Sequence, residues 1–165
     1  SAKELRESRF RLIFQEFNFH HPQLANTFGD AYLAKTPYKS HLLPRAKEVI
    51  AYLYPKYPLH IITNGFPEIQ RTKMQSGGIL DYFGEIVTSD EAGCKKPDAG
   101  IFLYLIKKIN TSASDCIMIG DNLLTDIAGA KDAGIDAVFY NPKQQAFQTD
   151  KAYEIKCLSE LMDIL

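Results

Sequence analysis

The sequence predicts a doubly wound α/β fold, in which a parallel sheet is covered by helices on both faces. From residue 43 onward, short apolar segments alternate with helical patterns, as is typical of consecutive βαβ units. The apolar segments contain few polar residues, which indicates strands buried on both faces. Polar residues and glycines follow two of these segments directly. In such folds the carboxyl ends of the strands are where ligands bind.

Residues 1–42 are predicted to be helical and to form a separate segment. Phe10, Phe14 and Phe17 are spaced as one face of a helix. Pro22 is suited to the first turn of a second helix. The apolar side chains expected on the inner side of that helix are Leu24, Phe28, Tyr32 and Leu33. These aromatic rings either line a substrate pocket or form the contact between the helices, and we favour the second interpretation for most of them.

Residues 43–165 supply the alternating elements. Helices are predicted over residues 44–54, 67–76, 97–109, 123–133 and 159–165. Strands are predicted over residues 59–63, 86–88, 116–119, 137–140 and 153–158. Pro97 is placed in the first turn of its helix, and Gly134 follows the helix that it is expected to end.

Composition narrows the classes of function. The 165 residues carry a net charge of −1 with both signs interspersed, and the absence of a basic stripe argues against a nucleic-acid partner. No apolar run is long enough to cross a bilayer, so no membrane partner is expected. The three cysteines, Cys94, Cys116 and Cys157, lack the spacing of a metal site. They are typical of free thiols in a reducing compartment, and we expect a cytoplasmic protein.

Thr63, Asn64 and Gly65 follow the predicted strand 59–63 and are candidates for binding a phosphate. A hydroxyl and successive backbone N–H groups can hold phosphate oxygens, and glycine lets the backbone approach closely. The alternative is an ordinary turn, because Asn-Gly is common in turns.

Lys96 precedes a predicted helix start, where the helix dipole disfavours a cation. A lysine is reasonable there if an anion lies in front of it, so Lys96 is a candidate for binding an anion. The alternative is a solvated surface lysine, as we expect for its neighbour Lys95.

Two carboxylates follow the predicted strand 116–119. Asp121 is expected to lie exposed at the strand tip, where it is a candidate ligand for Mg²⁺, which prefers oxygen ligands. Asp126 lies about one turn into the next helix and is a candidate to hold Lys96 or a metal-bound water. The alternative for Asp126 is a first-turn acid that the helix dipole favours. Asn122 or Thr125 is expected to cap this helix.

Taken in order, these motifs resemble those of the haloacid dehalogenase (HAD) superfamily of phosphohydrolases. ITNG resembles the second motif, with Thr63 and the amide of Asn64 binding phosphate. GCKKPD resembles the third, with Lys96 as the lysine that neutralises nucleophile and phosphate. GDNLLTD resembles the fourth, with Asp121 as the Mg²⁺ ligand and Asp126 as its second acid. The resemblance implies a HAD-like Rossmannoid core over residues 43–165 and part of a helical cap over residues 1–42.

One departure from the superfamily pattern concerns the nucleophile. The first motif is an aspartate nucleophile in DxDxT or DxDxV, yet no DxD occurs here, and Asp30 is the sole aspartate before Thr63. In the superfamily the strand that carries this motif lies between the strands that end at Thr63 and at Asp121. We therefore expect these residues to be inactive by themselves and to be the C-terminal part of a longer enzyme. A strand donated by another chain is the less favoured alternative.

The resemblance implies Mg²⁺-dependent hydrolysis of a small phosphorylated metabolite through an aspartyl-phosphate intermediate. The run LPRAKEVIAYL, followed by ITNGF, resembles most closely the branch that includes nucleoside-monophosphate phosphatases, so a nucleotide is a candidate substrate. The alternatives are a metal-free dehalogenase, a receiver-like domain, and a non-catalytic HAD-like binding or regulatory fragment. The third alternative accounts directly for the missing nucleophile.

Overall fold

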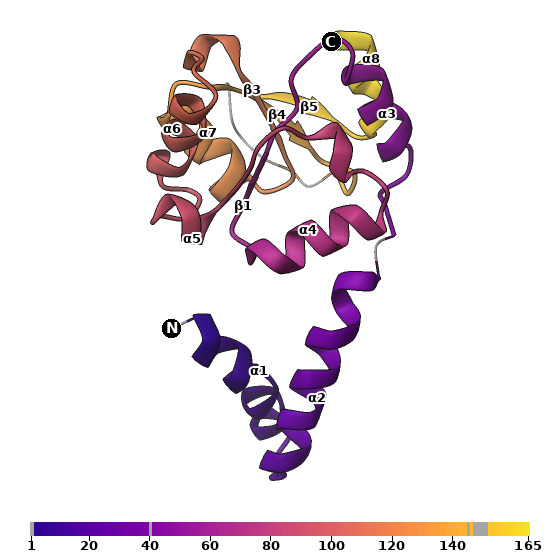
Figure 1. Ribbon diagram of the computed structural model, residues 1–165, viewed down its shortest axis with the longest axis vertical. Coiled ribbons are helices and arrows are strands. Elements are labelled where there is room, and N and C mark those ends of the chain that lie inside the picture. Colours follow the sequence, from indigo (N-terminus) through magenta and orange to yellow (C-terminus); the bar gives the residue numbers. More distant parts are fainter. Residues whose placement is uncertain (1, 40, 145, 147–151) are drawn as a thin grey trace. The chain divides into compact units, whose positions relative to one another are not determined.

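The computed structural model describes residues 2–39, 41–144, 146 and 152–165. The chain divides into two compact units, an N-terminal unit, Ser1–Ser40, and a C-terminal unit, His41–Leu165 (Figure 1). The sequence predicted a change in organisation between residues 42 and 43.

The N-terminal unit is a pair of helices joined by aromatic contacts. It contains α1 (Ala2–Glu16), α2 (Pro22–Lys35) and the short 3₁₀ helix η1 (Thr36–Tyr38). The ring of Phe28 lies 6.2 Å from that of Phe10 and 5.7 Å from that of Phe14, between centroids. These contacts confirm the predicted pairing of the two helices, but Phe28 and Tyr32, predicted on the inner side of α2, remain 50% and 43% exposed. The side chain of Leu33 lies outside the described side chains.

The prediction for Phe17 is wrong. Its side chain is 79% exposed, because α1 ends at Glu16 and Asn18 takes a left-handed conformation with φ 54°. The chain therefore turns before Phe17 can join the inner face, and Phe19 packs against Phe14 instead, at 5.2 Å between ring centroids.

The strands of the C-terminal unit form two parallel sheets. One sheet pairs β1 (Ile61–Thr63) with β2 (Ile86–Thr88), with Thr63 opposite Thr88. The other has the order β3–β4–β5. Its strands are β3 (Ile117–Gly120), β4 (Asp136–Tyr140) and β5 (Tyr153–Ile155). Within the described residues β1 and β3 each pair on one side only, so the parallel sheet expected from the sequence is present in two pieces.

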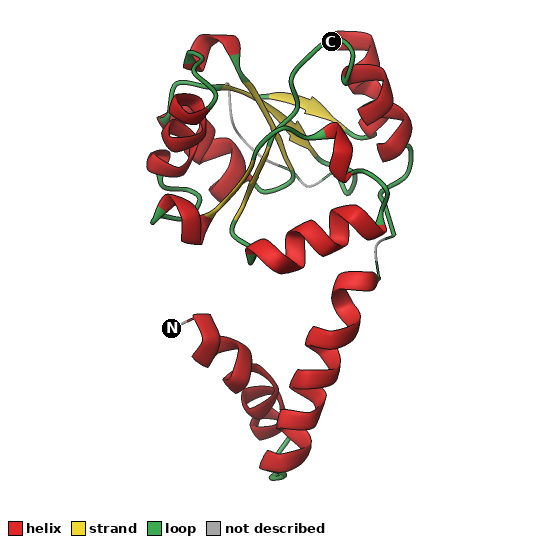
Figure 2. Ribbon diagram, in the orientation of Figure 1, coloured by secondary structure: helices red, strands yellow, loops and turns green. Residues whose placement is uncertain are grey.

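Helices cover these strands on both faces (Figure 2). The α-helices are α3 (Ala46–Leu53), α4 (Pro67–Ser76), α5 (Ser89–Ala92), α6 (Ala99–Lys108), α7 (Ala128–Asp132) and α8 (Leu161–Ile164). The short 3₁₀ turns are η2 (Leu80–Tyr82), η3 (Ala113–Asp115) and η5 (Leu158–Glu160). A π-helical turn, η4 (Leu123–Ile127), precedes α7.

Several predicted boundaries differ from the observed ones. Pro97 was expected in the first turn of α6 but precedes it, because the side chain of Asp98 caps the helix by accepting the N–H of Gly100 at 2.7 Å. The peptide bond between Lys96 and Pro97 is cis. The predicted helix 123–133 begins as a π-helical turn, and the strand predicted over residues 153–158 ends at Ile155. Gly134 follows α7 with φ 76°, as expected for a glycine that ends a helix.

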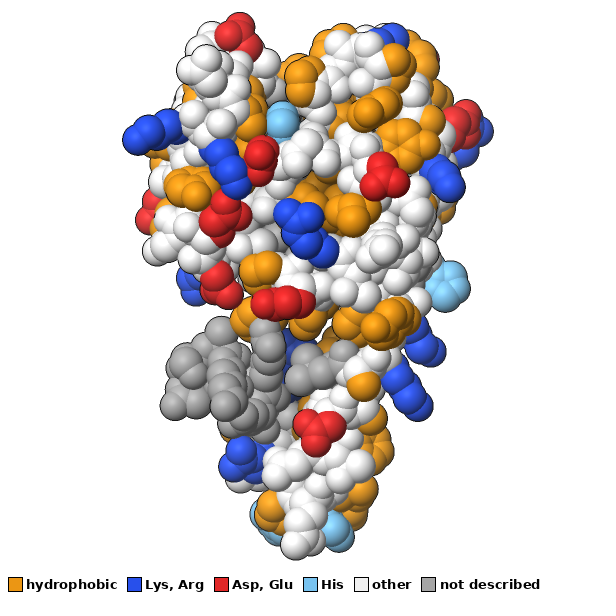
Figure 3. Space-filling view, in the orientation of Figure 1, with side chains coloured by type: hydrophobic (Ala, Val, Ile, Leu, Met, Phe, Trp, Pro, Cys, Tyr) orange, Lys and Arg blue, Asp and Glu red, His pale blue; other side chains and the backbone are white. Residues whose placement is uncertain are grey.

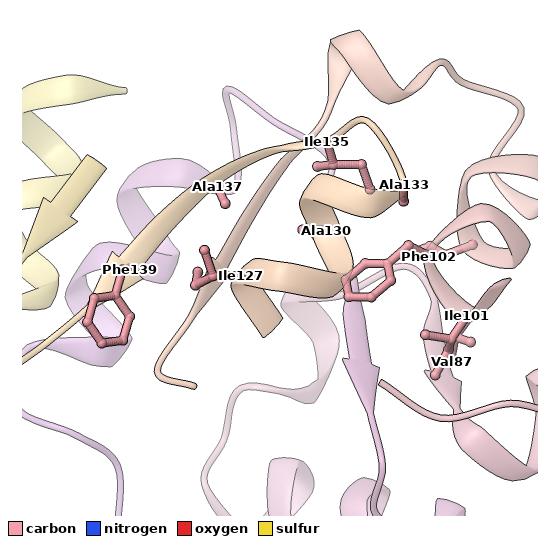
Figure 4. Close-up of a cluster of buried hydrophobic side chains, with 10 residues drawn as sticks. Val87, Ile101, Phe102, Ile127, Ala130, Ala133, Ile135, Ala137 and Phe139 are labelled. Carbon is pink, nitrogen blue, oxygen red and sulfur yellow. The ribbon is translucent and has the colours of Figure 1, made fainter. Parts of the chain in front are cut away.

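The core lies on both faces of the second sheet. Along β4, Ala137 and Phe139 pack into one buried cluster, while Val138 packs into another. The first cluster joins β4 to α6, η4 and α7 through Ile101, Phe102, Ile127 and Ala130, among others (Figure 4). The second joins β4 to α3, β5 and α8 through Val49, Leu53, Ile155 and Leu161. The alternation along β4 is that of a strand buried on both faces.

The surface carries mixed charge. Acidic and basic side chains are interspersed on the face shown in Figure 3. None of the helices in the described part of the chain combines the length and the apolar character needed to cross a membrane.

Candidate active site

The candidate residues lie where β1 and β3 end. Thr63 is the last residue of β1, and Asn64 and Gly65 follow it. Asp121 follows β3, and Asp126 lies in η4. Lys96 lies in the segment between α5 and α6. Hydrogen bonds and an ion pair connect Asn64, Lys96 and Asp126 across these elements.

The turn after β1 is closed by the side chain of Thr63. Its hydroxyl oxygen accepts the backbone N–H of Gly65 at 3.0 Å. That bond uses a lone pair of the oxygen and leaves the hydroxyl proton available to another acceptor. A Cβ on Gly65 would collide with the end of the flexible Gln70 side chain, which lies against this turn.

Asn64 connects this turn to the segment that carries Lys96. The side-chain nitrogen of Asn64 donates to the carbonyl of Lys96 at 3.1 Å, and its side-chain oxygen accepts the backbone N–H of Lys96 at 2.9 Å. Sequence reasoning considered only the backbone amide of Asn64. Nothing in the sequence pattern indicated the contact, because it joins two segments that lie far apart along the chain.

Lys96 and Asp126 form a largely buried ion pair. The Lys96 ammonium lies 2.7 Å from a carboxylate oxygen of Asp126, and the two side chains are 12% and 8% exposed. Two further donors reach the carboxylate, the hydroxyl of Thr125 at 3.2 Å and the backbone N–H of Asn122 at 3.3 Å. A buried pair of charges needs such additional hydrogen bonds to offset its desolvation. Lys96 is therefore not a solvated surface lysine, whereas Lys95 is exposed.

Asn122 holds the start of the helix that carries Asp126. Its side-chain oxygen accepts the N–H groups of Leu124 and Thr125, both at 3.0 Å. Its carbonyl accepts the N–H groups of both Asp126 and Ile127, which makes the first turn π-helical. The sequence predicted a cap at Asn122 or Thr125, and the structure places it at Asn122.

Asp121 is exposed at the tip of β3. No group of three or more His, Cys, Asp or Glu side chains that could hold a metal occurs among the described residues. Asp126 is engaged by Lys96, so Asp121 is the carboxylate here that is suited to a cation. Mg²⁺ is commonly bound by one or two carboxylates together with waters and substrate phosphate. These residues fit part of such a site.

His60 and Cys116 lie outside this group of residues. The Nδ1 of His60 accepts the N–H of Glu85 at 3.0 Å, and burial lowers the pKa of this imidazole, although the charge of Glu85 opposes the shift. Burial raises the pKa of the Cys116 thiol, as is usual for an unreactive cysteine.

A family model described as haloacid dehalogenase-like hydrolase matches residues 6–134. The chain belongs to this family. The match confirms the resemblance that the three motifs indicated, and the α/β fold with parallel strands is the one predicted.

Curated relatives of this HAD-like chain include phosphatases that act on different substrates. It is 32% identical over 155 residues to the ribulose-1,5-bisphosphate 5-phosphatase of Halopiger xanaduensis, covering 87% of this chain and 65% of the relative. It is 29% identical over 169 residues to the pyrimidine 5′-nucleotidase PynA of Streptococcus pneumoniae, covering 100% of this chain and 70% of the relative. The chain thus spans about two thirds of the length of these relatives.

A solved structure shares the fold of this HAD-like chain. The HAD-hydrolase YfnB of Bacillus subtilis, described as bound to magnesium, matches with a TM-score of 0.88 and 28% identity. The match covers 99% of this chain and 72% of that one.

Proposed function

We propose that this chain forms the phosphate-binding part of a Mg²⁺-dependent phosphomonoester hydrolase. The observation that carries the proposal is the buried Lys96–Asp126 pair, which is connected through Asn64 to the turn at the end of β1. Burying a cation costs desolvation free energy. A buried lysine at this position is therefore explained if the site binds an anion. The proposed substrate is a small phosphorylated metabolite. A nucleotide is a candidate, because a relative is a pyrimidine 5′-nucleotidase.

The proposed roles follow from the chemistry of each group. Phosphoryl transfer is catalysed mainly by positioning and by stabilising charge on the phosphoryl oxygens. Lys96 supplies a cation held in place by Asp126. The Thr63 hydroxyl, whose oxygen already accepts from Gly65, donates its proton to a phosphate oxygen. The backbone N–H of Asn64 is a further donor to the same phosphate, whereas the N–H of Gly65, a predicted donor, is already bonded to the Thr63 hydroxyl oxygen.

Asp121 is the proposed metal ligand. When bound, Mg²⁺ would neutralise charge on the phosphate and orient it. The N-terminal unit is proposed to be part of a helical cap.

The nucleophile is the part that these residues do not supply. No DxD occurs in the sequence, and within the described residues β1 and β3 each lack a strand on one side. We propose that turnover requires a strand carrying the nucleophilic aspartate between β1 and β3, at the position that the superfamily resemblance gives it. The second candidate function, a non-catalytic binding or regulatory fragment, is favoured by the same absence of the nucleophile.

Binding of inorganic phosphate to the 165-residue chain tests the proposal. We expect inorganic phosphate to bind in the presence of Mg²⁺. NMR chemical-shift changes at the amides of Asn64 and Gly65 would report this binding. Lys96→Ala should weaken this binding about 100-fold, as loss of a charged hydrogen-bonding partner does. Lys95→Ala is the matched control, because Lys95 is exposed, and it should change the affinity less than threefold.

Metal dependence and turnover complete the test. Asp121→Asn or chelation of Mg²⁺ should weaken phosphate binding, and the chain alone should not hydrolyse p-nitrophenyl phosphate. Phosphate binding that is indifferent to Lys96 would contradict the proposed site. Turnover by these residues alone would contradict the proposed need for another strand.

A further inference from the structure

The side chain of Asn64 is engaged at both ends by a single residue. Its nitrogen donates to the carbonyl of Lys96 and its oxygen accepts the N–H of Lys96, at 3.1 and 2.9 Å. This pairing has the form of a backbone ladder, with a side-chain amide in place of a peptide group. It attaches the Lys96 backbone to the end of β1, although Lys96 itself belongs to the segment between α5 and α6.

The same segment also packs closely against α7. A Cβ built on Gly129 would lie 2.6 Å from the carbonyl oxygen of Pro97 and 3.0 Å from its Cα. The helix therefore approaches this backbone as closely as a residue without a side chain allows. Together with the Lys96–Asp126 ion pair, 2.7 Å long, these contacts place Lys96 between the end of β1 and the helical segment that follows β3.

Lysine needs such support more than most residues. Its ammonium is a point charge at the end of a flexible four-carbon stem. A displacement of about 1 Å at a reacting centre can lower a rate about 100-fold. The hydrogen bonds to Asn64 fix the backbone of Lys96, and the ion pair with Asp126 fixes its ammonium, so both ends of the residue are held.

We propose that Asn64 is a positioning residue for Lys96. Its side chain holds the Lys96 backbone against the end of β1, and its main-chain N–H is left to bind the phosphate. The consequence for phosphate binding rests on the function proposed above, whereas the consequence for the Lys96 backbone does not.

The first test measures the Lys96 backbone directly, by amide hydrogen exchange in the 165-residue chain. Asn64→Ala removes the acceptor of the Lys96 N–H, and we expect exchange at that amide to become about tenfold faster, as loss of one hydrogen bond allows. Asn64→Asp replaces the donor to the Lys96 carbonyl with an oxygen that can only accept, so it should also speed exchange at the Lys96 amide. Asn26→Ala is the matched control, because Asn26 is exposed on α2, and it should leave the Lys96 amide unchanged.

The second test measures binding of inorganic phosphate with Mg²⁺. Asn64→Ala keeps the main-chain N–H but releases Lys96, and we expect about tenfold weaker binding. If Asn64→Ala does not fold, Asn64→Ser replaces it, since a hydroxyl is too short to bridge both Lys96 groups.

The outcomes separate this inference from the proposed function. Unchanged Lys96 exchange in a folded Asn64→Ala protein, or unchanged phosphate affinity where the wild type binds phosphate, would overturn the positioning role. Faster Lys96 exchange together with no phosphate binding even by the wild type would support the positioning role and overturn the proposed function.

Discussion

The ammonium of Lys96 lies 2.7 Å from the carboxylate of Asp126, and both side chains are largely buried. Each residue accounts for the burial of the other, because an isolated buried charge would be strongly unfavourable. The carboxylate also accepts the backbone N–H of Asn122 at 3.3 Å. Asp126 is therefore both a first-turn acid and the partner of the lysine, two interpretations that the sequence left as alternatives.

Removing one member of this pair should destabilise the fold. Asp126→Asn leaves the Lys96 charge buried without a counter-ion, and we expect the free energy of unfolding to fall by about 3 kcal/mol. Urea denaturation followed by circular dichroism measures this loss. Asp132→Asn, at an exposed position of α7, is the matched control and should change stability by less than about 0.5 kcal/mol. Equal effects of the two substitutions would argue against a buried pair.

Glycine to alanine should have opposite effects at two helical positions. At Gly129 the added Cβ would lie 2.6 Å from the carbonyl oxygen of Pro97 and from a ring carbon of Phe102. We expect Gly129→Ala to destabilise the chain by about 1–3 kcal/mol, as overpacking does. At Gly29, in α2, the nearest atom would be in Phe10 at 3.6 Å, an ordinary contact. Gly29→Ala should therefore stabilise its helix by about 0.5–1 kcal/mol, because alanine loses less backbone entropy.

Thermal denaturation of both glycine variants provides the comparison. A Gly129→Ala protein that is as stable as the wild type would show that α7 can move away from the Lys96–Pro97 segment.

Acidification should destabilise the chain through His60. Burial lowers the pKa of this imidazole below its ordinary value of 6.5, so the unfolded chain takes up a proton at higher pH than the folded one. The contribution of neutral His60 to stability is complete above pH 6.5 and is lost as the pH falls through the lower folded pKa.

The replacement His60→Asn isolates this pH effect. Asn offers an oxygen near the position of Nδ1, which accepts the N–H of Glu85, but it does not titrate. As the pH is lowered from 7 to 5, the free energy of unfolding of the wild type should decrease relative to that of His60→Asn. Urea denaturation at each pH measures this difference. A difference that stays constant with pH would mean that His60 has the same pKa in the folded and unfolded chains.

Part of the site was predictable from the sequence because the ends of the strands can be recognised in it. Apolar runs followed by Thr63-Asn64-Gly65 and by Asp121 indicated where two parallel strands end, and such ends meet at one edge of a sheet. The cap at Asn122 was among the expected alternatives because capping is local. The prediction for Pro97 was wrong because Asp98, one residue later, caps α6, so the helix begins after Pro97. Phe17 was misplaced because the left-handed turn at Asn18 ends the helical periodicity.

By itself, the sequence determined the fold class, the order of helices and strands, and the family. Hydrophobic periodicity and the order of motifs are properties of the linear sequence. The tertiary structure decided which residues meet: Asn64 with Lys96, Lys96 with Asp126, and Gly129 with Pro97. These relationships depend on distances between segments remote in sequence, which hydrophobic pattern and local propensity do not encode.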